Sequence, residues 1–318
     1  MAGNILVTAV GGDIGQGVVK CLRELPAYYD KLIGCDTNRY AAGAKWVDKF
    51  FIAPHSSKER EYGLFIDSLI RNEKIRYVFP INEDEIKFFN KNRSKYINSV
   101  KIFINTPFIL DTFLDKYKSM VFLKEHKITC PKTILLSKYS GGLIYPFLIK
   151  TRHSYGGKGV TMVNSHKEFE FYNKKSKDII VQEYIGSKHE EYTVGVFSNG
   201  GNIYSIAFRR YLSGECGGFS RFVELVHDTK ITKIAEEIAK LTGLNGTINI
   251  QMRKINGDYS IFEINPRISS TVYFRHFFGF QDIKWLLDTE LGKEIRFVPK
   301  YFKGVGVKAY TEVFFDME

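Results

Sequence analysis

Apolar runs rich in β-branched residues alternate with helical patterns through the first third of the chain. Residues 4–10 (NILVTAV) form a continuous apolar run, as expected of a strand buried on both faces of a parallel sheet. Because parallel strands are joined by crossover helices, this rhythm predicts a doubly wound α/β domain. The expected strands are 4–10, 31–35, 77–80 and 101–104, and the expected helices are 18–25, 59–72 and 83–90.

The glycine-rich turn at 11–17 allows a dinucleotide-binding interpretation. The fingerprint Gly-x-Gly-x-x-Gly places Val10, Gly12 and Gly15 in frame, so the first glycine is missing. Asp36 stands where a ribose-binding acid is expected. We favour a structural role, in which the glycines let the strand turn tightly into the helix. An NAD-dependent oxidoreductase that uses this turn is the alternative function.

Acidic residues follow another strand predicted in the same domain. The stretch 79–85 (FPINEDE) puts polar groups after the carboxyl end of the strand predicted at 77–80, where open α/β sheets bind ligands. Acids are also favourable in the first turn of a helix because they complement its dipole. The sequence leaves both explanations open.

A strand that ends in a lysine precedes a second glycine-rich loop. Residues 145–150 (YPFLIK) are followed by 151–160 (TRHSYGGKGV). Glycines let backbone N–H groups approach phosphate oxygens, and a lysine neutralises their charge. The other explanation is a hairpin turn at Gly156-Gly157. A Walker A loop is excluded, because no segment supplies its pattern.

The clearest pattern is a hairpin near the end of the chain. Two apolar strands, 246–252 and 259–265, flank the turn signal Asn-Gly-Asp at 256–258. Residues two apart on a strand share a face, so Glu263 and Asn265 point the same way, and Gln251 lies on the partner strand. Oxygen ligands of this kind suit Mg²⁺ held between protein and phosphates. The alternative is that Glu263 and Asn265 only face solvent on an edge strand.

The composition is that of an ordinary globular protein, and we expect that residues 1–10 are not a signal peptide. The net charge is +11, but the basic residues are scattered, so we expect no nucleic-acid partner. No apolar stretch approaches the ~20 residues that cross a bilayer, and we expect a cytoplasmic protein without a membrane partner. We interpret the cysteines as reduced thiols. They are Cys21, Cys35, Cys130 and Cys216.

From about residue 111 onward these motifs, in this order, resemble the ATP-grasp superfamily. The closest likeness is to carbamoyl-phosphate-synthetase-like and pyrrolysine-biosynthesis-type ligases, and the first part resembles the α/β domain that precedes the ATP-grasp core in such proteins. The resemblance implies an α/β domain at 1–110, an ATP-grasp lid lobe at 111–185 and a C-terminal lobe with the metal site at 186–318. The two lobes are expected to be of the α+β class.

The resemblance also implies a role for individual residues. Lys116 and Lys150 match phosphate-binding lysines, and Glu191 matches the acid that holds the ribose hydroxyls, although the link before it is longer than usual. Arg267 matches an arginine near the transferred phosphoryl group, and Arg209 is expected to face the same space. The implied phosphate loop includes Ser154, Gly156, Gly157 and Gly159. The implied adenine-binding hinge is Glu183, Tyr184 and Ile185. The implied metal ligands are Gln251, Glu263 and Asn265.

The resemblance therefore implies an ADP-forming ligase that uses ATP and Mg²⁺. It would activate a small carboxylate as an acyl phosphate and join it to a nucleophile, most often an amine. Lys150, Arg209 and Arg267 would serve the phosphoryl transfer. A non-catalytic ATP-binding protein is a further alternative, and we expect a homodimer.

Overall fold

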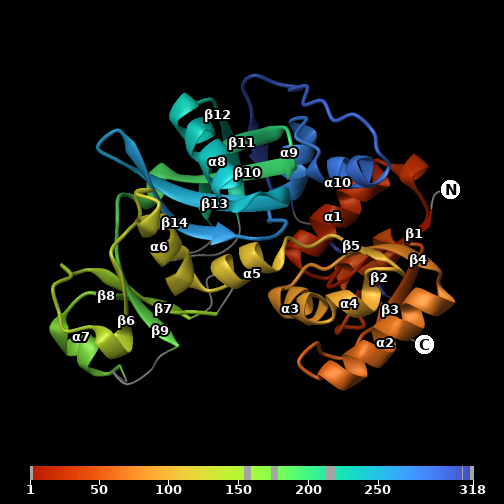
Figure 1. Cartoon of the computed structure of the whole chain (residues 1–318), viewed down its shortest axis with the longest axis horizontal. Helices are drawn as coiled ribbons and strands as arrows, with labels where there is room; N and C mark the ends of the chain where they lie inside the picture. The colour runs from red at the N-terminus through yellow and green to blue at the C-terminus, as the bar shows by residue number, and fades with distance from the viewer. Residues whose placement is uncertain (1–2, 154–158, 173–177, 213–219, 310, 316–318) are drawn as a thin grey trace.

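The computed structural model describes residues 3–153, 159–172, 178–212, 220–309 and 311–315, and in these ranges it forms three sheets with flanking helices (Figure 1). The predicted combination of a parallel α/β part with α+β parts is confirmed. No described helix is long and apolar enough to span a membrane.

The first sheet has five parallel strands in the order β3-β2-β1-β4-β5. Helix α1 packs on one face, and α2 and α3 pack on the other, so the predicted doubly wound arrangement is confirmed. Helix α2 has the predicted bounds, whereas α1 begins earlier than predicted, at Asp13. The strands are β1 (Gly3–Val7), β2 (Tyr29–Asp36), β3 (Lys49–Ile52), β4 (Ile75–Phe79) and β5 (Lys101–Ile102). The helices are α1 (Asp13–Arg23), α2 (Glu59–Asn72), α3 (Glu83–Lys91) and α4 (Arg93–Tyr96).

The glycine turn after β1 has a packing role. A Cβ atom on Gly15 would lie 2.2 Å from the carbonyl oxygen of Ala9, and one on Gly17 would lie 2.7 Å from Val272 Cγ1. The missing side chains therefore let α1 start close to β1 and pack against helix α9 (Val272–Phe277). This contact joins the first sheet's domain to the C-terminal part of the chain.

The second sheet has four strands in the order β6-β9-β7-β8, all paired antiparallel. Its small core lies around Phe147, Ile149 and Val181. The strands are β6 (Thr133–Leu135), β7 (Phe147–Thr151), β8 (Val160–Val163) and β9 (Ile179–Glu183). The helices near this sheet in sequence are α5 (Pro107–Phe113), α6 (Lys116–Glu125) and α7 (His166–Glu170).

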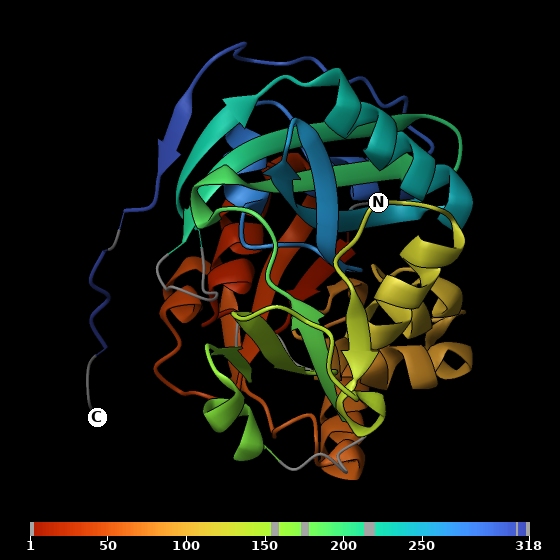
Figure 2. The same ribbon diagram turned by 90° about the vertical axis from the view of Figure 1, so that its left-hand side faces the viewer.

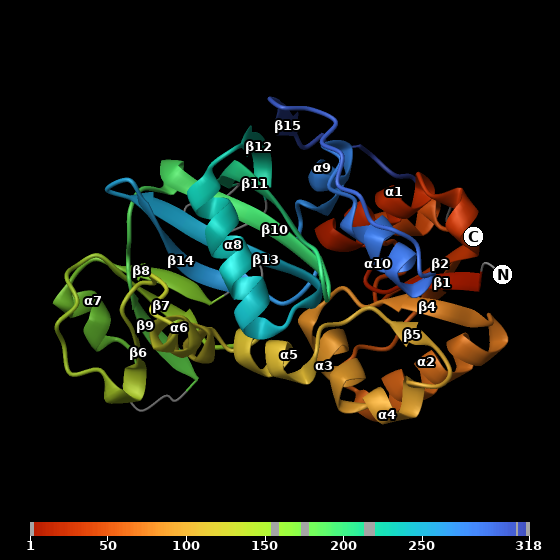
Figure 3. The same ribbon diagram turned by 45° about the horizontal axis from the view of Figure 1, so that its top comes forward.

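The third sheet is the largest, with the order β14-β13-β10-β11-β12-β15. Helix α8 lies over its outer face, as Figure 3 shows, and the other face is turned toward the second sheet (Figure 2). The strands are β10 (Glu191–Asn199), β11 (Ile203–Leu212), β12 (Ser220–Val226), β13 (Asn245–Ile255), β14 (Asp258–Asn265) and β15 (Val305–Val307). The helices are α8 (Thr229–Thr242), α9 and α10 (Asp282–Glu290).

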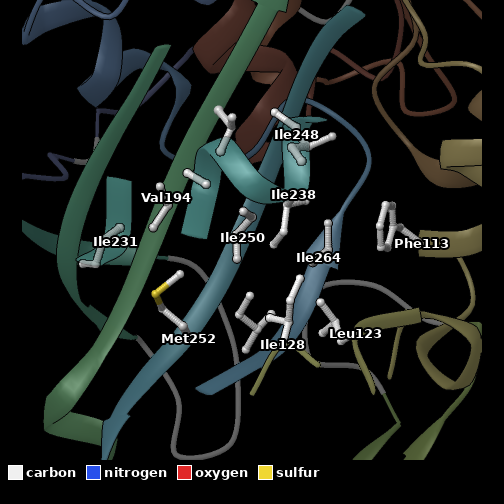
Figure 4. Packing of buried hydrophobic residues seen from close by; sticks show 14 of the residues in the cluster. Phe113, Leu123, Ile128, Val194, Ile231, Ile238, Ile248, Ile250, Met252 and Ile264 are labelled. Carbon is white, nitrogen blue, oxygen red and sulfur yellow. The ribbon is translucent and has the colours of Figure 1, made fainter. Parts of the chain in front are cut away.

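The main hydrophobic core fixes the hairpin that carries the predicted metal ligands. Ile250 and Ile264 of the hairpin pack with Ile238 of α8 and Leu123 of α6 (Figure 4). The opposite faces of β13 and β14 are therefore left to point away from this core. The predicted hairpin turn is confirmed: Asn256 and Gly257 have φ angles of 50° and 87°, as a type I′ turn requires.

Candidate functional site

One cavity of about 370 Å³ lies where the three sheets meet. The first sheet contributes the β1–α1 turn and the start of α3. The second contributes β7 and β9, and the third contributes β10, β11, β13 and β14. This position between two antiparallel sheets, closed at one end by an α/β domain, brings residues far apart in sequence into one site.

The predicted oxygen ligands line this cavity together. Gln251 pairs directly with Glu263 across β13 and β14, and Asn265 follows two residues later on the same face. The side-chain exposure of Glu263 is 25%, and the oxygen Oε1 of Gln251 accepts a hydrogen bond from Arg210 at 2.8 Å. The structure thus brings the three side chains into one patch that faces the cavity and not open solvent.

An irregularity in the hairpin adds an aromatic ring to the same wall. Gln251 pairs with Glu263, but Met252 pairs with Ile261, so Phe262 is the extra residue of a β-bulge. Phe262 and Glu263 therefore both line the cavity although they are consecutive. The ring lies 5.5 Å from the ammonium nitrogen of Lys150.

The two predicted phosphate-binding lysines reach the cavity from different elements. Lys150 lies in β7 and is buried, with its Nζ donating to Oε1 of Gln182 at 2.6 Å. Burial lowers the pKa of Lys150 to about 8, although nearby Glu263 favours the charged form. Lys116 is the first residue of α6, and its Nζ lies 4.0 Å from Oε1 of Glu263. Both cations thus stand beside the oxygen patch.

The position of Lys116 follows from how its helix begins. Asp115 caps α6 by accepting hydrogen bonds from the backbone N–H groups of Tyr117 and Lys118. Its carboxylate also pairs with Arg152, just after β7. The cap therefore ties the start of α6 to the end of β7 in the second sheet.

The predicted adenine hinge also lines the cavity. Glu183, Tyr184 and Ile185 follow one another from the end of β9. The Glu183 carboxylate accepts from the backbone N–H of Lys132, while the Ile185 carbonyl accepts from Arg253 Nη1 at 3.0 Å. The hinge is thus anchored on both sides.

Glu191 is buried between two arginines. Its oxygens accept from Arg210 Nη2 at 2.6 Å and from Arg253 Nη2 at 2.9 Å. Burial alone would raise the pKa of Glu191, but the two guanidinium groups outweigh it and hold the pKa below its usual value. The carboxylate therefore stays ionised and lines the cavity, while its role toward a ribose stays a prediction.

Arg209 does not face the cavity, contrary to the expectation from sequence. Its guanidinium donates to the carbonyl of His189 and pairs with Glu190 at 3.3 Å. Arg210 lines the cavity instead. Successive side chains of a strand point to opposite faces, so Arg209 and Arg210 cannot both face the cavity. On β11 the residue that faces the cavity is Arg210, which donates hydrogen bonds to Glu191 and Gln251.

Arg267 lines the cavity as expected, at its border with the first sheet's domain. Its Nη2 lies 3.5 Å from a carboxylate oxygen of Glu83, which is also buried in the cavity wall. Burial raises the pKa of Glu83, although Arg267 and Lys116 act against this. Of the two explanations for the stretch 79–85, the structure favours a cavity role for Glu83 itself.

The predicted phosphate loop is only partly described. Ser154, Gly156 and Gly157 lie outside the described residues, as do residues 213–219 with Cys216. Gly159 has a φ of 68°, and its carbonyl accepts from the backbone N–H of Thr151, which extends the pairing of β7 with β8. The cavity lining does not include Gly159. The roles assigned to these four residues stay predictions.

The dinucleotide interpretation gains no support from the glycine turn. Both oxygens of Asp36 accept backbone hydrogen bonds, from Gly11 N–H at 2.8 Å and from Asn38 N–H at 2.9 Å. Asp36 thus stabilises its own turn, and Gly15 is explained by its contact with Ala9. The structural explanation accounts for these residues without a bound dinucleotide.

Several cavity residues were missed from sequence. Asn249 and Arg253 share the inward face of β13 with Gln251, so the strand period of two could have found them. To predict Arg210, one must know which face of β11 points into the cavity. To predict Phe262, one must know that β14 contains a bulge. No cluster of three or more His, Cys, Asp or Glu able to hold a metal occurs within the described ranges.

Comparisons with known proteins relate the fold and part of the sequence to ATP-grasp proteins. Residues 175–313 match a family model described as "ATP-grasp in the biosynthetic pathway with Ter operon". A biotin carboxylase from Campylobacter jejuni, solved with β,γ-ATP, has the same fold, with a TM-score of 0.72 and 16% identity over 92% of this chain and 72% of that chain. The chain therefore has the fold of this solved structure, and the part of it at 175–313 is similar to an ATP-grasp family model.

Two curated relatives are similar in sequence. Tyramine–L-glutamate ligase from Methanocaldococcus fervens is 25% identical over 219 residues, 68% of this chain and 66% of the relative. The carbamoyl phosphate synthase large chain from Clostridium botulinum is 25% identical over 289 residues, 81% of this chain and 26% of the relative. The chain thus spans less than two thirds of either relative's length.

Proposed function

We propose that this protein is an ADP-forming ligase that uses ATP and Mg²⁺ to activate a small carboxylate and join it to an amine. One observation carries the proposal: a single cavity holds two lysines, an oxygen-ligand patch and a strand-end hinge. That combination suits a triphosphate with its metal and base. The name of one relative, a tyramine–L-glutamate ligase, describes the joining of an amine to an acid.

The oxygen patch fits a magnesium ion. It offers one carboxylate, Glu263, and two amide oxygens, from Gln251 and Asn265. Mg²⁺ prefers oxygen ligands and is commonly held by one or two carboxylates together with substrate phosphates and water. When bound there, the ion would neutralise charge on the phosphates. The position of Lys116, 4.0 Å from Glu263, places a second cation at the same point.

The first step is phosphoryl transfer. A carboxylate oxygen of the substrate attacks the γ-phosphorus, the bond from phosphorus to the β,γ-bridging oxygen breaks, and ADP leaves with the electron pair. Lys116, Lys150 and Arg267 would offset the charge that develops on the phosphate oxygens. Lys150 is buried, and the side chains of Lys116 and Arg267 are only 14% and 12% exposed, so their effect would be stronger than in bulk solvent.

The second step forms the amide. The amine, after losing one proton from its ammonium form, attacks the acyl carbon. The bond from that carbon to the phosphate oxygen breaks, inorganic phosphate leaves with the electron pair, and the nitrogen releases a second proton. Exclusion of water from the cavity would protect the acyl phosphate from hydrolysis.

The remaining assignments are part of the same proposal. We divide the chain into domains at 1–110, 111–185 and 186–318, which agrees with one sheet for each domain. Glu183, Tyr184 and Ile185 would bind adenine, and Glu191 would bind the ribose. A cytoplasmic location suits a reaction that draws on cellular ATP. The edge strand β15 exposes Val305 and Val307 by 59% and 68%, which is compatible with a homodimer.

A release assay tests the proposal. The protein would be incubated with ATP, Mg²⁺ and pooled carboxylates and amines, and ADP would be measured, with amino acids and dipeptides first. We expect ADP release that depends on both pools and is lost on removal of Mg²⁺. Failure of the protein to bind ATP at all, by calorimetry, would rule the proposal out.

A further inference from the structure

Glu83 is an acid in the cavity wall that the local fold does not use. The cap of helix α3 is made by Asn82 and Glu85, whose side chains bind each other's backbone N–H groups. Glu85 also accepts from the hydroxyl of Thr8, and Asp84 points outward with its side chain 43% exposed. Glu83 alone of these acids lines the cavity, and its exposure is 5%.

The surroundings of Glu83 place it at the reacting end of the cavity. Arg267, expected beside the transferred phosphoryl group, lies 3.5 Å away. Lys116 and Glu263, which flank the proposed metal site, are close enough to act on the Glu83 carboxylate electrostatically. At 3.5 Å, Arg267 compensates the buried charge of the Glu83 carboxylate only in part. A second cation in the cavity would therefore bind favourably to Glu83.

A second buried polar residue lies in the same wall. Asn249 is 1% exposed, and its Nδ2 has no hydrogen-bond partner among the described residues. Its orientation is fixed because Oδ1 accepts from Thr193 at 3.0 Å and from Arg275 at 3.4 Å. Asn249 pairs with Asn265 on the hairpin, two residues before Arg267.

We propose that Glu83 binds the ammonium group of the amine substrate, so that the second substrate enters as a primary amine and not as a neutral or anionic nucleophile. This inference rests on the proposed function and adds the group that receives the amine. The domain before the ATP-grasp core thereby selects the nucleophile, while the two lobes hold the nucleotide.

Two nucleophiles separate amine binding from phosphoryl transfer. Hydroxylamine is mostly uncharged at neutral pH and traps an acyl phosphate as a hydroxamate, whereas primary amines arrive as cations. The assay would use the carboxylate found by the ADP screen, with either hydroxylamine or a pool of primary amines and amino acids. The variants are Glu83→Gln, which removes the charge and keeps the shape, and Asp84→Asn as a matched control on the same helical turn.

We expect Glu83→Gln to form hydroxamate within about threefold of the unchanged protein, while kcat/KM for the amine falls about 100-fold through loss of a charged hydrogen bond. Asp84→Asn should change neither. Should Glu83→Gln be poorly folded, Glu83→Asp keeps the charge and should raise KM for the amine more than it lowers kcat.

Three outcomes would overturn the inference. Unchanged amine kinetics in Glu83→Gln would exclude ammonium binding, and an equal loss of hydroxamate would assign Glu83 to phosphoryl transfer. If the unchanged protein forms neither ADP nor hydroxamate with any carboxylate, the proposed function itself fails and the inference falls with it.

Discussion

The ammonium nitrogen of Lys150 lies 2.6 Å from Oε1 of Gln182, in a cavity wall where both side chains are almost fully buried. Neighbouring strands β7 and β9 carry them, with Leu148 opposite Gln182 in the ladder. A buried cation held by a neutral amide is costly for the fold. We infer that Lys150 serves to bind a negatively charged ligand.

Replacing this lysine should separate stability from function. Lys150→Met removes a buried charge and keeps most of the volume, so we expect the free energy of unfolding at pH 7 to rise by about 1–3 kcal/mol. ADP formation should be lost. Urea unfolding and the ADP assay measure the two effects, and a variant that is both less stable and fully active would contradict the interpretation.

The stability gain should depend on pH in a defined direction. The pKa of Lys150 is about 8 in the folded chain, below its usual value of 10.5, so the unfolded chain binds more protons between these values. Folding stability of the unchanged protein should therefore gain from rising pH across this window. The difference in stability between Lys150→Met and the unchanged protein should be largest below pH 8 and should shrink toward pH 10. Thermal unfolding at several pH values measures it.

Nucleotide affinity should show the opposite trend. Above pH 8 Lys150 of the free protein loses its proton, so a triphosphate must restore it on binding, and the Kd for ATP should rise by up to about tenfold per pH unit. Lys150→Arg keeps its charge throughout and should flatten the profile if the larger group is accommodated. Calorimetry from pH 7 to pH 9.5 provides the comparison; parallel slopes for the two proteins would argue against a role for Lys150 in phosphate binding.

The two adjacent arginines of β11 form a matched pair for mutagenesis. Arg210→Ala leaves Glu191 buried with one partner fewer and should cost about 2–5 kcal/mol of stability and weaken ATP binding. Arg209→Ala removes a partly exposed ion pair and should change stability by less than about 0.5 kcal/mol. Denaturant unfolding of both variants checks this. Equal effects would mean that the faces of β11 are assigned wrongly.

Sequence periodicity predicted the hairpin ligands but not every neighbour. Glu263 and Asn265 share a face because strands repeat every two residues, and that rule holds wherever the strand is regular. The rule does not predict Phe262, because the bulge shifts the register of β14 at this residue. Arg209 was chosen over Arg210 since a strand's pattern alone does not tell which of two adjacent arginines faces inward, and an offset of one residue reverses the answer.

The contacts between domains could not be predicted from the sequence, for a different reason. The sequence placed Glu83 at the end of a strand, but its approach to Arg267 depends on how α1 packs against α9. That packing rests on Gly17, which sequence could only explain as a glycine in a turn. Local patterns predict elements and their faces, whereas the meeting of two domains depends on side chains that are distant along the chain.

The most direct test of the central claim is the Mg²⁺-dependent binding of ATP to Glu263→Ala compared with the unchanged protein. Removing the one carboxylate of the oxygen patch should abolish ADP formation and weaken binding of ATP in Mg²⁺ by at least about tenfold, with the folded structure retained by circular dichroism. Near-normal binding and turnover by Glu263→Ala would contradict a nucleotide held between Lys116, Lys150 and the patch.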